Sequence, residues 1–127
     1  MTGLSFPVAA NTTYRFKFYI VYSAAATTTG SRWAVNGPSI SGGFLHYTST
    51  YTLTSASITT NQGLDAYDLP AGANATSATT GSNIAVIEGV IKATSSGTVI
   101  ARFASEVGSS AIVAKGGMSW VEFEVLQ

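Results

Sequence analysis

The chain has 127 residues, and only 9% of them are Asp, Glu, Lys or Arg, against about 25% in ordinary soluble domains. Six basic and six acidic side chains give a formal net charge of zero, so the chain lacks the basic excess that favours nucleic acid, and none is expected as a partner. The absence of cysteine excludes a disulfide framework and thiolate metal ligands. We expect one domain over residues 1–127.

The N-terminal residues lack the basic and continuous apolar regions of a secretory signal, so we expect no such signal there. No stretch approaches the roughly 20 apolar residues of a membrane-spanning helix, so a membrane is not an expected partner. Residues 4–8 are expected to begin the first strand, and Pro7 favours a sheet edge because proline cannot donate to a strand ladder. The segment from Thr2 to Val8 is a candidate to reach a partner.

Residues 13–23 show the clearest strand pattern, with side chains alternating between two faces. One face starts with Arg15 and Lys17 and ends with the apolar Tyr19 and Val21, which predicts a strand that passes from solvent into a contact with a neighbouring subunit. The other face is expected in the core and consists of Tyr14, Phe16, Phe18, Ile20 and Tyr22.

Two further strands are expected at 31–36, which places Trp33 and Val35 on one side, and at 44–54. Along 44–54, the sole histidine, His46, shares the outward face with threonines, as is typical of a solvated sheet surface. Residues 61–82 are rich in Gly, Ala, Asn and Thr, and we expect them to form a long irregular connection.

Residues 83–93 are expected to form a strand that is apolar on both faces. A strand of this kind is covered on both sides. In so small a sandwich we expect a neighbouring subunit to supply the second cover, and Ile87 and Ile91 are among the predicted contacts.

Glu88 is an acid within this apolar strand, and a buried acid needs a partner or a neutral form. The natural candidate is Arg102, on the strand expected at 98–105 after the turn at 94–97. The two side chains are predicted to pair if the two strands form a hairpin, at or near a symmetry axis in an oligomer.

The C-terminal part is expected to add strands at 111–115 and 118–126, the latter with Val121, Phe123 and Val125 inside. The opposite face of that last strand carries Trp120, Glu122 and Glu124. The chain thus contains about eight strands with turn signals between them and no convincing helix. This pattern predicts an all-β fold, an antiparallel β-sandwich of jelly-roll-like type.

Chemistry-bearing residues are few, and no catalytic, cofactor or metal site is predicted, so we do not expect an enzyme. His46 lacks a local orienting carboxylate and nucleophile. Asp65 and Asp68 are too few for calcium, which takes about six to eight oxygen ligands, and loop-capping hydrogen bonds are favoured. Glu122 and Glu124 lie on one face of one strand, where ion pairing is favoured over a paired-carboxylate site.

Five segments carry a resemblance that runs along nearly the whole chain: 2–16, 25–30, 34–38, 83–89 and 97–107. Together they resemble a β-domain found in structural proteins of tailed bacteriophages, which is also similar to trimeric jelly-roll modules. The resemblance implies a structural homotrimer within the virion and no catalytic residue.

We therefore expect a homotrimeric capsid decoration (cement) protein that binds the major capsid protein, or another virion protein, and stabilises the capsid surface. If Met1 is the natural start, a small free-standing chain fits this role better than a fibre tip, which follows a stalk. The alternative is a receptor-binding tip domain of a tail fibre or spike that recognises host surface glycan, with Trp33 and Trp120 as candidate sugar platforms. The predicted subunit contacts are Tyr19, Val21, Ile87, Glu88, Ile91, Arg102 and Trp120.

Overall fold

The computed structural model describes residues 4–54, 56–68 and 76–126, and within them the secondary structure consists of strands without a helix. No helix in this described part is therefore long and apolar enough to cross a membrane. The strands are β1 (Ser5–Val8), β2 (Thr13–Ala24), β3 (Ser31–Asn36), β4 (Phe44–Thr54), β5 (Ser57–Leu64), β6 (Asn83–Lys92), β7 (Gly97–Ser105), β8 (Ile112–Ala114) and β9 (Trp120–Val125).

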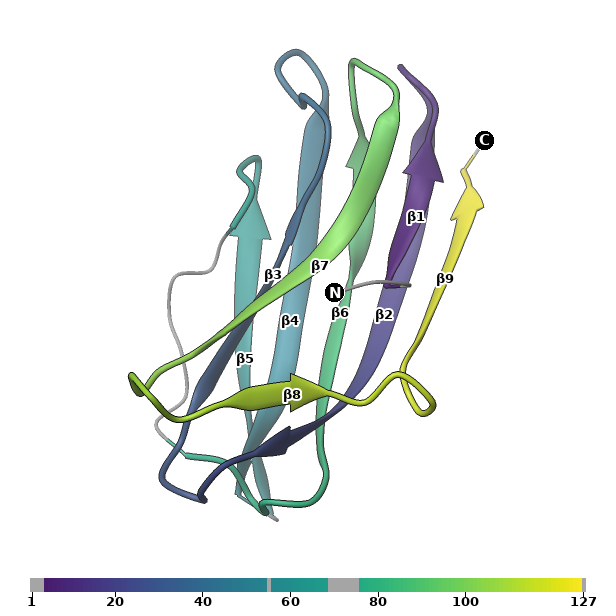
Figure 1. Cartoon of the computed structure of the whole chain (residues 1–127). Helices are drawn as coiled ribbons and strands as arrows, with labels where there is room; N and C mark the ends of the chain where they lie inside the picture. Colours follow the sequence, from purple (N-terminus) through teal and green to yellow (C-terminus); the bar gives the residue numbers. More distant parts are fainter. Residues whose placement is uncertain (1–3, 55, 69–75, 127) are drawn as a thin grey trace.

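The strands form two antiparallel sheets that pack face to face, with the three-stranded sheet in front in Figure 1. One sheet has the order β1-β7-β3, and the other has the order β5-β4-β6-β2-β8, with β9 also paired to β2. The chain crosses between the sheets five times, at each connection from β1 to β4 and on both sides of β7, as in a jelly roll. The predicted antiparallel β-sandwich is confirmed.

One edge of β2 is covered by two short strands in succession. Residues 22–24 of β2 pair with β8, and residues 14–19 pair with β9. At the break between them, the Val21 carbonyl accepts from the Lys115 amide at 2.8 Å, and the Ser119 hydroxyl accepts from the Val21 amide at 3.1 Å. The whole edge is thereby hydrogen-bonded, although no single strand runs along it.

The core follows from the alternation along β2. Every inward side chain is at most 7% exposed, and burial of each stabilises the fold by about 1.5–3 kcal/mol. This confirms the predicted core face, which consists of Tyr14, Phe16, Phe18, Ile20 and Tyr22.

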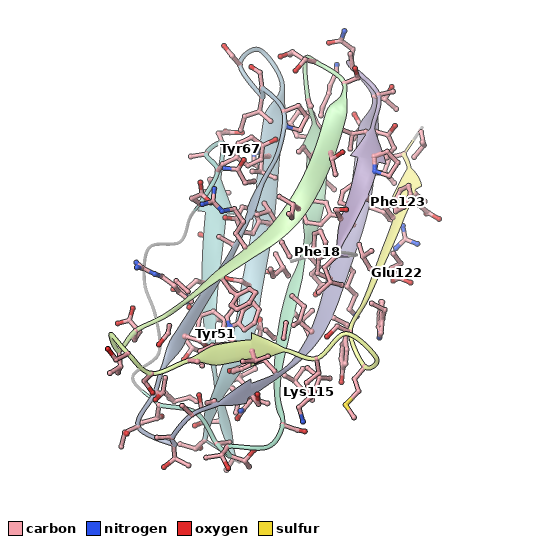
Figure 2. All side chains as sticks on the ribbon, viewed as in Figure 1. Phe18, Tyr51, Tyr67, Lys115, Glu122 and Phe123 are labelled. Atoms are coloured by element: carbon pink, nitrogen blue, oxygen red, sulfur yellow. The ribbon has the colours of Figure 1, made fainter. Side chains whose placement is uncertain are left out.

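An aromatic cluster around Phe6 closes one end of the core. The Phe6 ring, from β1, lies 5.5 Å from Phe16 and 5.9 Å from Phe18 of the opposite sheet, between ring centroids. It also stacks on Phe123 of β9 at 4.9 Å, and Figure 2 shows Phe18 and Phe123 among the side chains between the strands. Phe123 faces inward as predicted but remains 44% exposed, because β9 lies at the sheet margin.

The other end of the core contains buried polar groups that satisfy one another. The Trp33 indole donates to the Ser31 hydroxyl at 2.9 Å, and that hydroxyl donates to the Tyr22 oxygen at 3.4 Å. The Tyr51 hydroxyl accepts from the Asn61 amide at 2.7 Å. Burial raises the pKa of Tyr51 despite this hydrogen bond, which acts in the opposite direction.

Two glycines allow close packing around Tyr47, which is paired to Gly63 of β5 on one side and to Gly89 of β6 on the other. A Cβ atom at Gly63 would lie 2.4 Å from the Tyr47 ring. A Cβ atom at Gly89 would lie 2.1 Å from the backbone oxygen of His46. Both positions therefore require glycine.

The described residues contain nine strands, whereas the sequence predicted about eight, so one strand was missed. The missed strand is β5, whose C-terminal half falls within the connection predicted as irregular at 61–82. Its sequence, Ser57 to Leu64, is mostly polar, with Ile58 and Leu64 as its apolar side chains, and lacks the apolar alternation that marks the other strands. Of the rest of that predicted connection, residues 69–75 lie outside the described residues.

The predicted pairing of Glu88 with Arg102 is wrong. β6 pairs with β2 and β4, whereas β7 lies in the other sheet between β1 and β3, so these two strands do not form a hairpin. Arg102 instead pairs with Asp68, with Nη1 and Oδ2 3.2 Å apart. Glu88 faces outward on the six-stranded sheet and is exposed, so it carries no cost of burial.

Candidate functional site: the outer face of the six-stranded sheet

The strand register places the outward side chains of the six-stranded sheet in rows that run across five strands. Two adjacent rows carry no charge, and we call them the uncharged band. The first row consists of Trp120, Tyr19, Val86, Thr50 and Thr60. The second row consists of Val21, Ile84, Thr52 and Ile58.

Large apolar side chains of the band are open to solvent. Ile58 is 63% exposed, Ile84 44% and Trp120 41%. The ring of Tyr19 stacks on that of Trp120, with centroids 5.2 Å apart and planes within 7°. A contiguous apolar patch of this kind on a flat sheet is the usual mark of a binding surface.

Beside the band lie two rows that contain charges. In the first, Lys17 lies between Glu122 on β9 and Glu88 on β6. The Lys17 ammonium also lies 5.9 Å from the centroid of the Trp120 ring, within the range of a cation–π interaction. This row thus alternates acid, base and acid across three strands.

The second charged row contains the ion pair of Arg15 and Glu124, whose Nε and Oε1 atoms are 2.6 Å apart. The hydrogen bond and charge of Arg15 lower the pKa of Glu124, and Glu124 in turn raises the pKa of Arg15. Ion pairing of this glutamate, the interpretation favoured from the sequence, is therefore present within one chain.

The structure brings four of the seven predicted contact residues together on this face: Tyr19, Val21, Glu88 and Trp120. Ile87 and Ile91 are 0% exposed within the chain's own core, so the prediction that their side chains contact a neighbouring subunit is wrong. Arg102 lies on the outer side of the other sheet.

Sequence reasoning chose the wrong face of β6, although a signal was available. Glu88 shares its face with Ile84 and Val86, and the opposite face of the strand carries no charge. Because charged side chains are rarely buried, Glu88 indicates that its own face of β6 is the one exposed to solvent. Ile84, Val86 and Ile58 are therefore the functional candidates that sequence reasoning missed.

The loop after β5 connects the two sheets through both aspartates. The Asp65 Oδ1 atom accepts from the Leu45 amide at 3.0 Å and lies 3.5 Å from His46 Nε2. Tyr67 donates to the Pro38 carbonyl at 2.6 Å, and burial raises the pKa of Tyr67 to about 12. Asp68 accepts from Asn36, so both carboxylates make the loop hydrogen bonds favoured from the sequence.

His46 thus has a carboxylate partner that sequence reasoning missed, because β5, which leads to Asp65, was not predicted. Both side chains are more than half exposed. Within the described residues, no group of three or more His, Cys, Asp or Glu side chains is arranged to hold a metal ion.

No protein-family model, curated protein or solved structure matches the chain. Nothing in these comparisons links the chain to a phage structural family. The interpretation of function therefore depends on that resemblance and on the chemistry of the surface.

Proposed function

We propose that the chain is a structural protein of a tailed-bacteriophage virion, a homotrimer that decorates and stabilises the capsid surface. The observation that carries self-association is the uncharged band, with its exposed Ile58, Ile84 and Trp120. The resemblance described above supports the phage assignment. Many copies on a capsid lattice gain strength by avidity even when each contact is weak.

The area of the face supports a second protein surface as its occupant. Five strands at a spacing of about 4.8 Å and four rows at about 6.8 Å give a flat area of roughly 650 Å². Side-chain relief adds to this figure, and a standard interface buries about 800 Å² on each partner. The area of one such face is thus close to the area that each partner buries in a standard interface.

The charges favour identical copies as that partner. The row of Glu122, Lys17 and Glu88 contains both signs in alternation. An identical row displaced by one strand places opposite charges against each other, whereas a partner of one sign meets repulsion somewhere along the row. Around a threefold axis, the uncharged bands of three copies would face one another, with the charged rows beside them.

The test is the mass of the protein in solution, measured by sedimentation velocity at micromolar concentration. The wild type is expected at the mass of three 13.1 kDa chains. Val86→Lys places an ammonium in the centre of the band, where burial without a partner costs several kcal/mol, and is expected to give a folded monomer. The matched control is Ile100→Lys, which adds the same charge to the outer face of the three-stranded sheet and is expected to leave the trimer intact.

A monomeric wild type, or a trimer that survives Val86→Lys, contradicts the proposal. Capsid decoration, the second part of the proposal, is tested by adding the trimer to purified tailed-phage capsids that lack decoration protein and imaging the particles. Density on the capsid surface supports decoration. Binding to host cells in place of capsids contradicts decoration and favours the receptor-binding alternative.

A further inference from the structure

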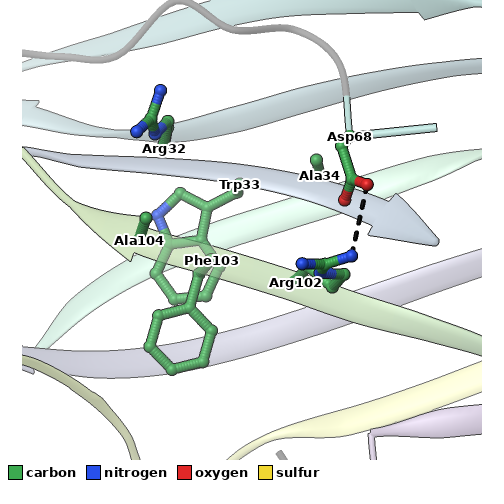
Figure 3. Close-up of a pocket in the computed structure, with 7 residues that line it drawn as sticks. All are labelled: Arg32, Trp33, Ala34, Asp68, Arg102, Phe103 and Ala104. Carbon is green, nitrogen blue, oxygen red and sulfur yellow. Dashed lines mark hydrogen bonds and ion pairs between the residues drawn. The ribbon is translucent and has the colours of Figure 1, made fainter. Parts of the chain in front are cut away.

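The outer face of the three-stranded sheet contains a hollow of about 350 Å³. Figure 3 shows it between Arg32 on β3 and Arg102 on β7, with Asp68 at one side. This volume lies at the lower end of the range for small-molecule sites, which suits a ligand of about one ring.

The register of β3 and β7 explains the hollow. Arg32 is paired across the strands with Ala104, and Arg102 is paired with Ala34. Each long side chain therefore stands beside a methyl group, and the two alanines form an apolar floor between the arginines. Ala34 faces outward yet is only 9% exposed, because the surrounding side chains rise around it.

Asp68 forms one wall of the hollow and takes part in three hydrogen bonds. Its amide donates to the Val35 carbonyl at 3.0 Å, and its Oδ2 atom accepts from Asn36 at 2.8 Å and from Arg102 at 3.2 Å. Both contacts use the same oxygen, and among the described residues Oδ1 accepts no hydrogen bond. Oδ1 is therefore a positioned acceptor that is available to a ligand hydroxyl.

Arg32 is exposed and supplies a cation without a counter-ion. All six acidic side chains of the chain lie in its described part, and none of them forms an ion pair with Arg32. The Glu106 amide donates to the Gly30 carbonyl, so Glu106 lies near the start of β3. Its carboxylate nevertheless forms no ion pair with Arg32. A guanidinium in this state is suited to bind a carboxylate in a bidentate manner.

We propose that this hollow binds a carboxylate-bearing sugar, such as a uronic or sialic acid. The carboxylate contacts Arg32, a ring hydroxyl donates to Asp68, and the apolar face of the ring covers Ala34 and Ala104. A small anion is expected to bind more weakly, because Asp68 repels it and it fills little of the hollow. A neutral sugar is also expected to bind more weakly, because it leaves Arg32 without a counter-ion. The site is independent of the proposed trimer contact, because it lies on the opposite side of the sandwich.

The experiment is an NMR titration of the labelled full chain with glucuronate, and in parallel with N-acetylneuraminate, glucose and acetate. At least one acidic sugar is expected to bind with a Kd of about 1 mM and to shift the amides around Arg32 and Arg102. Glucose and acetate are expected to bind about tenfold more weakly or less, since each satisfies only part of the site.

Two variants test the assignment. Arg32→Gln removes the free cation and is expected to weaken acidic-sugar binding about tenfold or more. Its matched control is Lys115→Gln, which removes the same charge from the turn between β8 and β9. The Lys115 ammonium donates to the Ser82 hydroxyl, and neither residue lines the hollow, so this variant is expected to leave binding unchanged. Ala104→Met fills the floor of the hollow and is expected to block binding while all charges remain.

Several outcomes overturn the proposal. They are the absence of binding by either acidic sugar, affinity for acetate or glucose equal to that for the sugars, or an unchanged affinity in Arg32→Gln or in Ala104→Met. None of them depends on the mass measured for the trimer, so this proposal and the proposed function fail separately.

Discussion

The outer face of the six-stranded sheet is wide and presents uncharged side chains in continuous rows, whereas the outer face of the three-stranded sheet is narrow and hollowed between two arginines. Both faces arise from the same alternation of side chains along strands. The two faces differ in which side chains are neighbours across adjacent strands. Threonine and valine beside isoleucine give a broad uncharged surface, with a hollow of about 720 Å³ over Ile58 and Ile84, that suits another protein. Alanine beside arginine gives a smaller recess between charges, which suits a small molecule.

Among the variants that test this difference between the two faces, Trp120→Ala is expected to have the largest effect. Trp120→Ala removes the stack on Tyr19 and the contact with Lys17, and buried tryptophans dominate many interfaces. The trimer dissociation constant is expected to rise about 30-fold, or about 2 kcal/mol, in sedimentation equilibrium. Ile100→Ala on the other face is the control, and an equal loss of association in that variant contradicts the assignment of the interface to one face.

A smaller effect is expected at the loop that carries Asp68. Tyr67→Phe removes the hydrogen bond to Pro38 and is expected to cost about 1 kcal/mol of unfolding free energy at neutral pH, measured with urea. It is also expected to loosen the wall of the hollow without a change in trimer mass. A change in trimer mass contradicts the independence of the two faces.

The same variant makes a prediction at alkaline pH. The folded chain keeps the Tyr67 proton up to a pKa of about 12, against 10.0 for an ordinary tyrosine. The stability that Tyr67 contributes is therefore complete below about pH 10 and is lost as the pH rises toward about 12. The free energy of unfolding of the wild type is expected to fall more steeply with pH in this window than that of Tyr67→Phe. If the unfolding free energies of the two proteins fall in parallel with pH, the contribution of Tyr67 is contradicted.

The smallest effect is expected at the surface ion pair of the six-stranded face. Arg15 lowers the pKa of Glu124 below its ordinary 4.5, so the stability from this pair is present above that value and is lost as the pH falls through the lowered pKa. Arg15→Gln is expected to flatten the acid limb of the stability curve slightly, in urea unfolding followed from neutral to acid pH. Lys115→Gln is the control, and an equal flattening in that control contradicts the assignment.

The sequence predicted the fold best where alternation is strict. The inward faces of β2 and β9 and the outward position of Trp120 were all predicted, because apolar side chains occupy every second position and the charged side chains all fall on the opposite face. β5 was not predicted, since a mostly polar strand has no such signal. In β6, both faces are apolar, and alternation alone does not say which one is inside.

The candidate site was predicted only in part, because it depends on contacts between distant segments. Tyr19 and Trp120 were named from their strands, but their stacking needs the pairing of β2 with β9. The pair of Arg102 and Asp68 joins a strand of one sheet to a loop that leaves the other. No local pattern encodes this contact, and Glu88, on the preceding strand, was chosen in its place.

The edge of β2 has a consequence for the order in which the chain folds. Residues 14–19 are made early in synthesis, whereas their partners in β9, residues 120–125, are made almost last. Closing so long a loop is entropically slow, and an open strand edge pairs readily with other chains. A nascent chain halted before Trp120 therefore presents half of this edge and an uncovered Phe6 ring, and such truncated products are expected to aggregate where the finished chain does not.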